Sequence, residues 1–303
     1  MSKIDVNAIV ADVQKLYNKD PKSKSMISTG NTIRKQYTAK DGVPVPDGHP
    51  LKELVGLPCV PYNKILQVAG NPDTGKSTFC GQLMAAAQKS GHVVILLDTE
   101  DKMDAYRFEK YFGGKPDDII LLKTNEILQG GEKVRKTITS TKSLYPDSKI
   151  LFIWDSVGGA QSRGYAEREL DDEKPGQPGQ ESKENGQVMK MLVGLINKYP
   201  DSIACLLANT VYAKIGFMQH GDKESGGKKI EFHSSLIIKL KRVKVLTKTV
   251  RGQKVKYGIL SRAVITKNHL SQSETSIHQL DFEITASGAK ISSEQGGDDG
   301  DQE

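Results

Sequence analysis

The stretch Ile65-Leu66-Gln67-Val68-Ala69-Gly70-Asn71-Pro72-Asp73-Thr74-Gly75-Lys76-Ser77-Thr78 decides the fold of this chain. Its apolar first half predicts a buried strand, and the residues that follow match the pattern G-x-x-x-x-G-K-[ST] at the start of a helix. Inward-pointing backbone N–H groups and the helix N-terminus favour a bound polyphosphate. Lys76 is expected to reach its β- and γ-phosphates, and Ser77 to offer its hydroxyl to Mg²⁺. The segment Gly70–Thr78 therefore predicts a nucleotide site.

Length, charge and cysteine usage narrow the class of protein. With 303 residues and a net charge of +6, we expect one α/β core with short terminal elements. No apolar run approaches the length of a membrane span and no signal-peptide core is present, so we expect a soluble, cytoplasmic protein. Cys59, Cys80 and Cys205 are widely spaced in apolar segments, which predicts buried free thiols and no structural zinc.

Strands and helices alternate along the middle of the chain. Apolar runs of strand length alternate with segments of helical periodicity, and this order predicts a mostly parallel sheet covered by helices on both faces. Ligands of such sheets bind at the carboxyl ends of the strands. The predicted strands are 65–70, 93–98, 119–122, 150–155 and 203–209, and the predicted helices are 76–89, 103–112, 127–144 and 185–198.

Both ends of the chain differ from this core. Residues 5–18 predict a short amphipathic helix, and Met26 and Ile27 end a charged linker that must dock on its own core or on a neighbouring subunit. Residues 38–50 are rich in glycine and proline and predict a loop. The predicted organisation is an N-terminal oligomerisation helix with its linker over 1–35, a core over 36–290 and a disordered acidic tail over 291–303.

The last part of the core predicts an antiparallel extension of the sheet. Residues 236–245 and 254–267 form two apolar and basic runs separated by a turn at Gly252, and another strand lies near Phe282. Positive charge continues from Lys228 to Lys267, so an anionic partner is at least as well supported as a solvated surface.

Polar residues at the predicted strand ends are candidates for chemistry. Asp155 follows an apolar strand where a carboxylate can hold the Mg²⁺ shell. Glu100 is the best candidate for orienting an attacking water, but the pattern does not separate it from Asp98 or Asp101. Asn209 ends another strand, where it either senses a terminal phosphate or only forms a turn.

Two long polar segments follow strands, at 161–184 and 210–227. Long segments of this kind inside a compact domain are functional or disordered, and we favour function. The first is markedly acidic over residues 167–173, and the second ends in Gly226 and Gly227.

Several motifs together resemble one family. Leu-Leu-Asp-Thr-Glu100, Phe-Ile-Trp-Asp155-Ser, Leu-Leu-Ala-Asn209, Lys214-Ile215-Gly216 and Thr266-Lys267-Asn268-His269 follow the phosphate loop in the order found in RecA-type DNA recombinases. The resemblance covers about residues 5–285 and implies a RecA-like P-loop NTPase core.

The resemblance also implies roles for particular residues. It assigns water activation to Glu100 and γ-phosphate sensing to Asn209, where the family usually has glutamine. It places Lys267, and His269 in place of a second lysine, at ATP across the subunit interface, and makes Tyr106 the candidate for holding adenine. Met26 and Ile27 would dock on the neighbouring protomer. The DNA-facing residues would be Arg163, Lys214, Ile215, Gly216, Phe217, Met218, Lys223, Gly226, Gly227, Lys228 and Lys229.

The function implied is that of an ATP- and Mg²⁺-dependent recombinase of a bacterial or phage-infected cell. It would form helical filaments on single-stranded DNA and pair it with homologous double-stranded DNA, with single-strand-binding and loader proteins as further partners. Few residues remain after 285, so a core-only, phage-borne form is expected. A hexameric helicase-type motor and an accessory paralogue that uses ATP as a clamp are the alternatives.

Overall fold

The chain divides into two units, Met1–Tyr37 and Thr38–Glu303, and each is described by itself. In the first unit, helix α1 (Val6–Tyr17) forms where the sequence predicts a helix. The described residues of the computed structural model are 5–17, 37–163, 179–213, 222–270 and 278–291.

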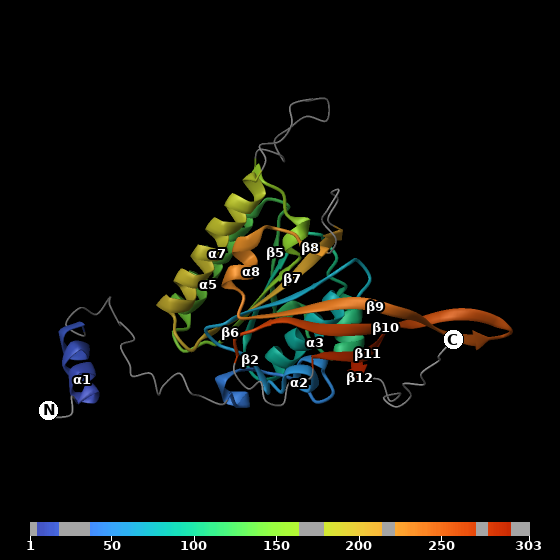
Figure 1. The fold of residues 1–303 in the computed structure, drawn as a ribbon, viewed down its shortest axis with the longest axis horizontal. Coiled ribbons are helices and arrows are strands. Elements are labelled where there is room, and N and C mark those ends of the chain that lie inside the picture. Colours follow the sequence, from blue (N-terminus) through green and yellow to red (C-terminus); the bar gives the residue numbers. More distant parts are fainter. Residues whose placement is uncertain (1–4, 18–36, 164–178, 214–221, 271–277, 292–303) are drawn as a thin grey trace, which may run out of the picture. The chain divides into compact units, whose positions relative to one another are not determined.

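A mostly parallel sheet forms the centre of the second unit (Figure 1). Six neighbouring strands run parallel in the order β9-β3-β7-β6-β4-β5. This spatial order differs from the order along the chain, and it places β3 in the interior, between β9 and β7. This confirms the predicted α/β class. The strands are β3 (Ile65–Gly70), β4 (Val93–Asp98), β5 (Ile119–Lys123), β6 (Ile150–Asp155), β7 (Ile203–Ala213) and β9 (Leu236–Val250).

Helices cover both faces of this sheet. Successive residues of a strand point to opposite faces, and in the buried strands the residues on both faces are apolar. On β4, Ile95 and Leu97 pack with α5 and α7, whereas Leu96 lines a small cavity shared with α3 and α4. The helices are α3 (Lys76–Lys89), α4 (Ala105–Phe112), α5 (Ile127–Leu144), α7 (Gln180–Lys198) and α8 (Lys228–His233).

The predicted antiparallel extension is present and longer than expected. β9 pairs with β10 through a turn at Arg251 and Gly252, whose φ angles of 51° and 77° both lie in the left-handed region. β11 pairs with β10 only from Gly258 onward, so the end of the β9–β10 hairpin continues as the two-stranded arm seen in Figure 1. The added strands are β10 (Gln253–Asn268), β11 (Gln279–Thr285) and β12 (Gly288–Ile291).

The expectation of a loop over 38–50 was wrong in part. Gly42 pairs with Pro61, and a Cβ atom at Gly42 would lie 2.0 Å from the Val60 carbonyl oxygen, so this strand pair depends on contacts that local sequence does not reveal. The short elements here and elsewhere are η2 (Ala39–Asp41), β1 (Gly42–Pro44), α2 (Pro50–Val55), β2 (Cys59–Pro61), η3 (Pro116–Asp118), η4 (Val157–Gly159) and β8 (Asp222–Glu224).

The two long polar segments are shorter than predicted. α7 already begins at Gln180, so the helix takes up the end of the segment 161–184. β7 continues to Ala213 and its end pairs with β8 (Asp222–Glu224), so strand structure takes up both sides of the segment 210–227 before the turn at 225–226. Cys59, Cys80 and Cys205 are free and buried, as predicted. Within the described residues, no helix combines the length and apolar character needed to cross a bilayer.

Candidate nucleotide site

The phosphate loop lies where β3 ends and α3 begins. Gly75 caps the N-terminus of α3 with φ 99° and, having no side chain, leaves the N–H groups of the first turn without a capping side chain. A Cβ atom at Gly75 would lie 1.7 Å from Cδ1 of Ile284, so glycine is required both by the backbone angle and by the close packing of β11. These open N–H groups form the anion-binding end of the helix.

The side chain of Lys76 is hydrogen-bonded to the backbone of the phosphate loop. Its Nζ donates to the carbonyl oxygens of Gly70 and Asn71, each at 2.9 Å. Burial lowers the pKa of Lys76, although the nearby carboxylates of Asp155 and Glu100 oppose this shift. The ammonium is therefore held directly beside the anion-binding turn.

Ser77 and Asp155 supply the oxygen ligands that a magnesium ion prefers. Both side chains line the same pocket, and burial raises the pKa of Asp155 although Ser77 and the charge of Lys76 act to lower it. Among the described residues, no group of three or more histidine, cysteine, aspartate or glutamate side chains forms a metal cluster. One hydroxyl and one carboxylate fit Mg²⁺, which keeps waters and takes its remaining ligands from substrate phosphates.

The structure gives different surroundings to the three acidic residues Asp98, Glu100 and Asp101 at the end of β4 and just after it. Asp98 is buried, and its carboxylate accepts hydrogen bonds from the backbone N–H groups of Glu100, Lys102 and Met103, so it shapes the loop. Asp101 pairs with Lys123, outside the pocket. Glu100 alone of the three lines the pocket that contains the phosphate loop.

Two donors hold the Glu100 carboxylate. Ser156 donates its hydroxyl to Oε1, and Lys102 forms an ion pair with Oε2. Burial acts to raise the pKa of Glu100, but these hydrogen bonds and the charges of Lys102 and Lys76 outweigh it and lower the pKa. Glu100 is therefore ionised and oriented.

Sheet register brings these groups together. Asp98 of β4 lies opposite Asp155 of β6, and Gly70 of β3 lies opposite Thr210 of β7. Thr210 lines the pocket. Asn209 is fully buried instead: its Nδ2 donates to the Ser225 carbonyl oxygen at 3.0 Å, and its Oδ1 accepts from the Thr210 N–H at 2.8 Å. Sequence reasoning missed Thr210, because register depends on how the strands pair.

The adenine candidate lies away from the pocket. Tyr106 is 62% exposed, and its hydroxyl accepts a hydrogen bond from Lys110. The next residue, Arg107, lines the pocket instead. A signal in the sequence could have indicated this, because Phe108 and Phe112 mark the inward face of the helix, and Tyr106 lies about 200° around the axis from Phe108.

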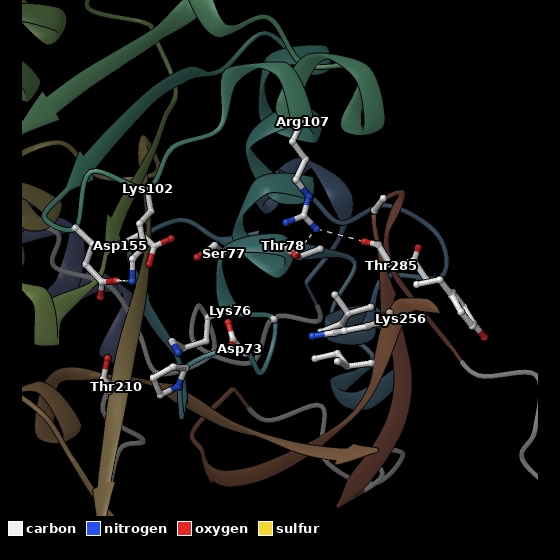
Figure 2. A pocket seen from close by; sticks show the side chains of 18 residues that line it. Asp73, Lys76, Ser77, Thr78, Lys102, Arg107, Asp155, Thr210, Lys256 and Thr285 are labelled. Carbon is white, nitrogen blue, oxygen red and sulfur yellow. Dashed lines mark hydrogen bonds and ion pairs between the residues drawn. The ribbon is translucent and has the colours of Figure 1, made fainter. Parts of the chain in front are cut away.

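The pocket is a cavity of about 550 Å³ with two ends. Figure 2 shows Lys76, Asp155 and Thr210 on one side of Ser77 and Thr78, and Arg107, Lys256 and Thr285 on the other. The lining residues are Pro72, Asp73, Gly75, Lys76, Ser77, Thr78, Glu100, Lys102, Arg107, Asp155, Thr210, Lys256, Tyr257, Gly258, Ile259, Ile284, Thr285 and Ala286.

Lys267 and His269 do not line this pocket. Lys267 donates its Nζ to the Glu231 and Phe232 carbonyl oxygens at 2.7 and 3.2 Å, at the C-terminal end of α8. His269 donates its backbone N–H to Ser235. Lys267 lies near the end of β10, and His269 directly follows that strand.

The predicted DNA-facing residues are described only in part. Arg163 is exposed, and its backbone N–H donates to Oε2 of buried Glu184. Gly226 and Gly227 have φ angles of 81° and 86° and lead into exposed Lys228 and Lys229. Lys223 lies in β8. Outside the described residues lie Met26, Ile27, Lys214, Ile215, Gly216, Phe217 and Met218.

Comparison with known proteins gives a consistent result. Residues 8–287 match the family model of the RecA N-terminal domain. The chain is 24% identical over 281 residues to Protein RecA of a Methylobacterium species, covering 92% of this chain and 70% of that protein. It is 26% identical over 233 residues to Protein RecA of a Nitratiruptor species, covering 76% of this chain and 62% of that protein.

A third relative, Protein RecA of Campylobacter jejuni, is 25% identical over 214 residues, or 69% of this chain and 59% of the relative. The chain thus spans about 60 to 70% of the length of these relatives. Because the family model matches residues 8–287, nearly the whole core, the chain belongs to the RecA family.

Proposed function

We propose that this protein is an ATP-dependent DNA recombinase that forms helical filaments on single-stranded DNA and promotes homologous pairing and strand exchange. The observation that carries the proposal is the grouping of Lys76, Ser77, Asp155, Glu100 and Thr210 in one pocket of a RecA-family core. This grouping provides a phosphate cradle, magnesium ligands and a carboxylate for water activation.

The hydrolytic roles follow from position and charge. The N-terminus of α3 and Lys76 would bind the phosphates of ATP, and Ser77 and Asp155 would hold Mg²⁺, which would supply positive charge next to the transferred phosphoryl group. Glu100, kept ionised by Lys102 and Ser156, orients and deprotonates the attacking water.

Thr210 connects the terminal phosphate to the second DNA-facing segment. Its side of the pocket adjoins Lys76, and its carbonyl oxygen accepts from the Ser225 N–H at 2.8 Å. Asn209 makes a second hydrogen bond to Ser225, because its Nδ2 donates to the Ser225 carbonyl oxygen. A contact between phosphate and Thr210 would shift β7 and Ser225 together. We therefore assign the phosphate-sensing role to Thr210 and not to Asn209.

Subunit contacts would complete the site. Lys267 and His269 would reach ATP of the adjacent protomer, since neither lines the pocket of its own chain. Among the described strands the sheet ends at β5, whose Ile120 and Leu121 are 37% and 40% exposed. An exposed apolar edge strand is a site for adding another strand, and the linker with Met26 and Ile27 of a neighbour would dock there.

DNA would bind beside the loops that leave β6 and β7. Arg163, Lys228 and Lys229 are exposed there and can contact DNA phosphates. Lys214, Ile215, Gly216, Phe217, Met218 and Lys223 are proposed to add contacts. Single-strand-binding and loader proteins are the proposed partners in assembly.

One experiment tests the proposal: ATP hydrolysis with Mg²⁺, with and without single-stranded DNA, over a series of protein concentrations, with negative-stain imaging of the same samples. We expect DNA-stimulated turnover per protomer that rises as open helical filaments form. Closed rings would instead support a hexameric motor. ATP binding without turnover would support an accessory paralogue, and absence of both DNA stimulation and filaments would overturn the proposal.

A further inference from the structure

Arg107 lies in the half of the pocket that faces away from the hydrolytic groups. Figure 2 shows its guanidinium on the opposite side of Thr78 from Lys76, Asp155 and Thr210. The roles proposed above use none of its atoms. The two hydrogen-bond acceptors of its guanidinium are neutral oxygens, so neither balances its positive charge.

The guanidinium is fixed by two elements of the core. Its Nη2 donates to Oγ1 of Thr78 on α3 at 2.8 Å and to the carbonyl oxygen of Thr285 on β11 at 3.3 Å. Its Cζ lies 5.6 Å from the centre of the Phe112 ring. Since these contacts fix the plane of the group, its remaining donors have a defined direction and lose little entropy on binding a ligand.

One terminal nitrogen of the guanidinium remains available for a ligand, because the hydrogen bonds described above use only the other. Nε is buried and has no hydrogen-bond partner among the described residues. The contacts found for the guanidinium in the described part of the chain occupy Nη2 alone among its terminal nitrogens. In Figure 2 the other terminal nitrogen points into the pocket. Arg107 is half-buried, and a partly desolvated cation with an open donor is stabilised by an anionic ligand such as a phosphate oxygen.

The direction of a bound nucleotide follows from the first turn of α3. Lys76 and Ser77 are expected at the β- and γ-phosphates and at Mg²⁺, so the phosphate next to the ribose lies toward Thr78. Thr78 is the third residue of α3, and its N–H is among the free donors of that turn. Arg107 donates to the side chain of this same residue.

We propose that Arg107 donates a hydrogen bond to the α-phosphate of a bound nucleoside polyphosphate. The contact positions the nucleotide through its phosphate and is therefore independent of the base. It rests on the proposed nucleotide binding but not on filament formation or DNA strand exchange.

The test is the dissociation constant of purified protein for ATP, ADP, GTP and inorganic tripolyphosphate, measured by calorimetry with Mg²⁺ and without DNA. For Arg107→Gln we expect binding of all four to weaken by about tenfold to a hundredfold, the range for one lost charge-assisted hydrogen bond. The ratio of ATP to GTP affinity should stay unchanged. Arg107→Lys, which keeps the charge, should retain part of the affinity.

Lys110→Gln is the matched control, because Lys110 lies on the same helix, contacts Tyr106 and does not line the pocket. A changed ATP to GTP ratio with unaltered tripolyphosphate binding would show a contact with the base and overturn the proposal. A lower melting temperature with unaltered affinities would show that Arg107 only joins α3 to β11, which also overturns it. Nucleotide binding without DNA-stimulated turnover would contradict the recombinase but leave this proposal standing.

Discussion

Single residues in this pocket have roles that only their partners reveal. Asp98 and Glu100 are two positions apart, yet one carboxylate accepts backbone N–H groups while the other faces Lys76 and the phosphate loop. In the sequence both are acidic residues after an apolar strand. The difference arises because Asp98 ends β4 in a buried position, and the chain then turns so that Glu100 reaches Ser156.

Replacing Glu100 by Gln tests water activation. The amide keeps the size of the side chain but removes the base, so ATP turnover should fall by about a hundredfold or more, while ATP binding changes little. Single-turnover hydrolysis and calorimetric binding measure the two effects. Asp101→Asn is the matched control, since Asp101 pairs with Lys123 outside the pocket. Wild-type turnover in the Glu100 variant would contradict the assignment.

His49 predicts a pH dependence of stability. It is buried at the N-terminus of α2, where Nδ1 accepts from the Leu51 N–H and Nε2 lies 3.2 Å from the Phe79 carbonyl oxygen. Burial lowers the pKa of His49 from 6.5 to about 4. The folded state disfavours protonation of His49. The stability that neutral His49 contributes to the free energy of unfolding is therefore fully present above pH 6.5 and is lost as the pH falls toward 4.

The corresponding change is measurable by urea unfolding between pH 7.5 and 4. Lowering this pKa from 6.5 to about 4 corresponds to about 3 kcal/mol in the free energy of unfolding. His49→Gln should be less stable than wild type at pH 7.5, and the difference should shrink as the pH falls. His278→Gln, at an exposed position, should follow the wild-type curve. A constant difference between His49→Gln and wild type would contradict the prediction.

At the scale of elements, the β9–β10 arm and the long β7 strand differ most from expectation. β7 was predicted to end at Asn209, but it continues to Ala213 because its end pairs with β8. The β9–β10 arm extends beyond the last pairing of β11. Exposed basic residues on that arm include Lys248, Arg251 and Lys254.

The arm predicts a salt-dependent contribution to DNA binding. Lys248→Gln combined with Lys254→Gln should lower the slope of log affinity against log salt by up to about two, because each neutralised phosphate contact contributes about one. Fluorescence anisotropy with single- and double-stranded DNA over a salt series gives the slope. Lys136→Gln combined with Lys198→Gln, at exposed positions on α5 and α7, is the control. Equal slopes for the two double variants would exclude the arm from DNA binding.

At the scale of the whole molecule, assembly should depend on a segment outside the compact core. The proposed docking of Met26 and Ile27 on a neighbouring protomer places an apolar pair at the subunit contact. Ile27→Asp should abolish filaments and the rise of turnover with concentration, while each protomer still binds ATP, because its own pocket is unchanged. Sedimentation velocity and negative-stain imaging measure assembly.

Leu144→Asp is the control for this effect, since Leu144 ends α5 and is 70% exposed. It should assemble like the wild type. Filaments of normal length from Ile27→Asp would show that the linker is not part of the subunit contact.

The sequence by itself determined the nucleotide-binding element and most of the core. β3, β4, β6, α3 and α5 begin and end where their apolar periodicity and the glycine-flanked loop predict, because these elements are long, regular and buried. The placement of Lys76 and Ser77 at the helix start also follows from local pattern alone.

Only the tertiary structure decided which side chains share the pocket. Thr210 lies beside Gly70 through strand pairing, and Arg107 is held by Thr78 and Thr285, the latter 178 residues away along the chain. Periodicity shows which face of a strand or helix is buried, but not which distant element covers it. The phosphate loop is therefore a property of local sequence, whereas the pocket around it depends on register and packing.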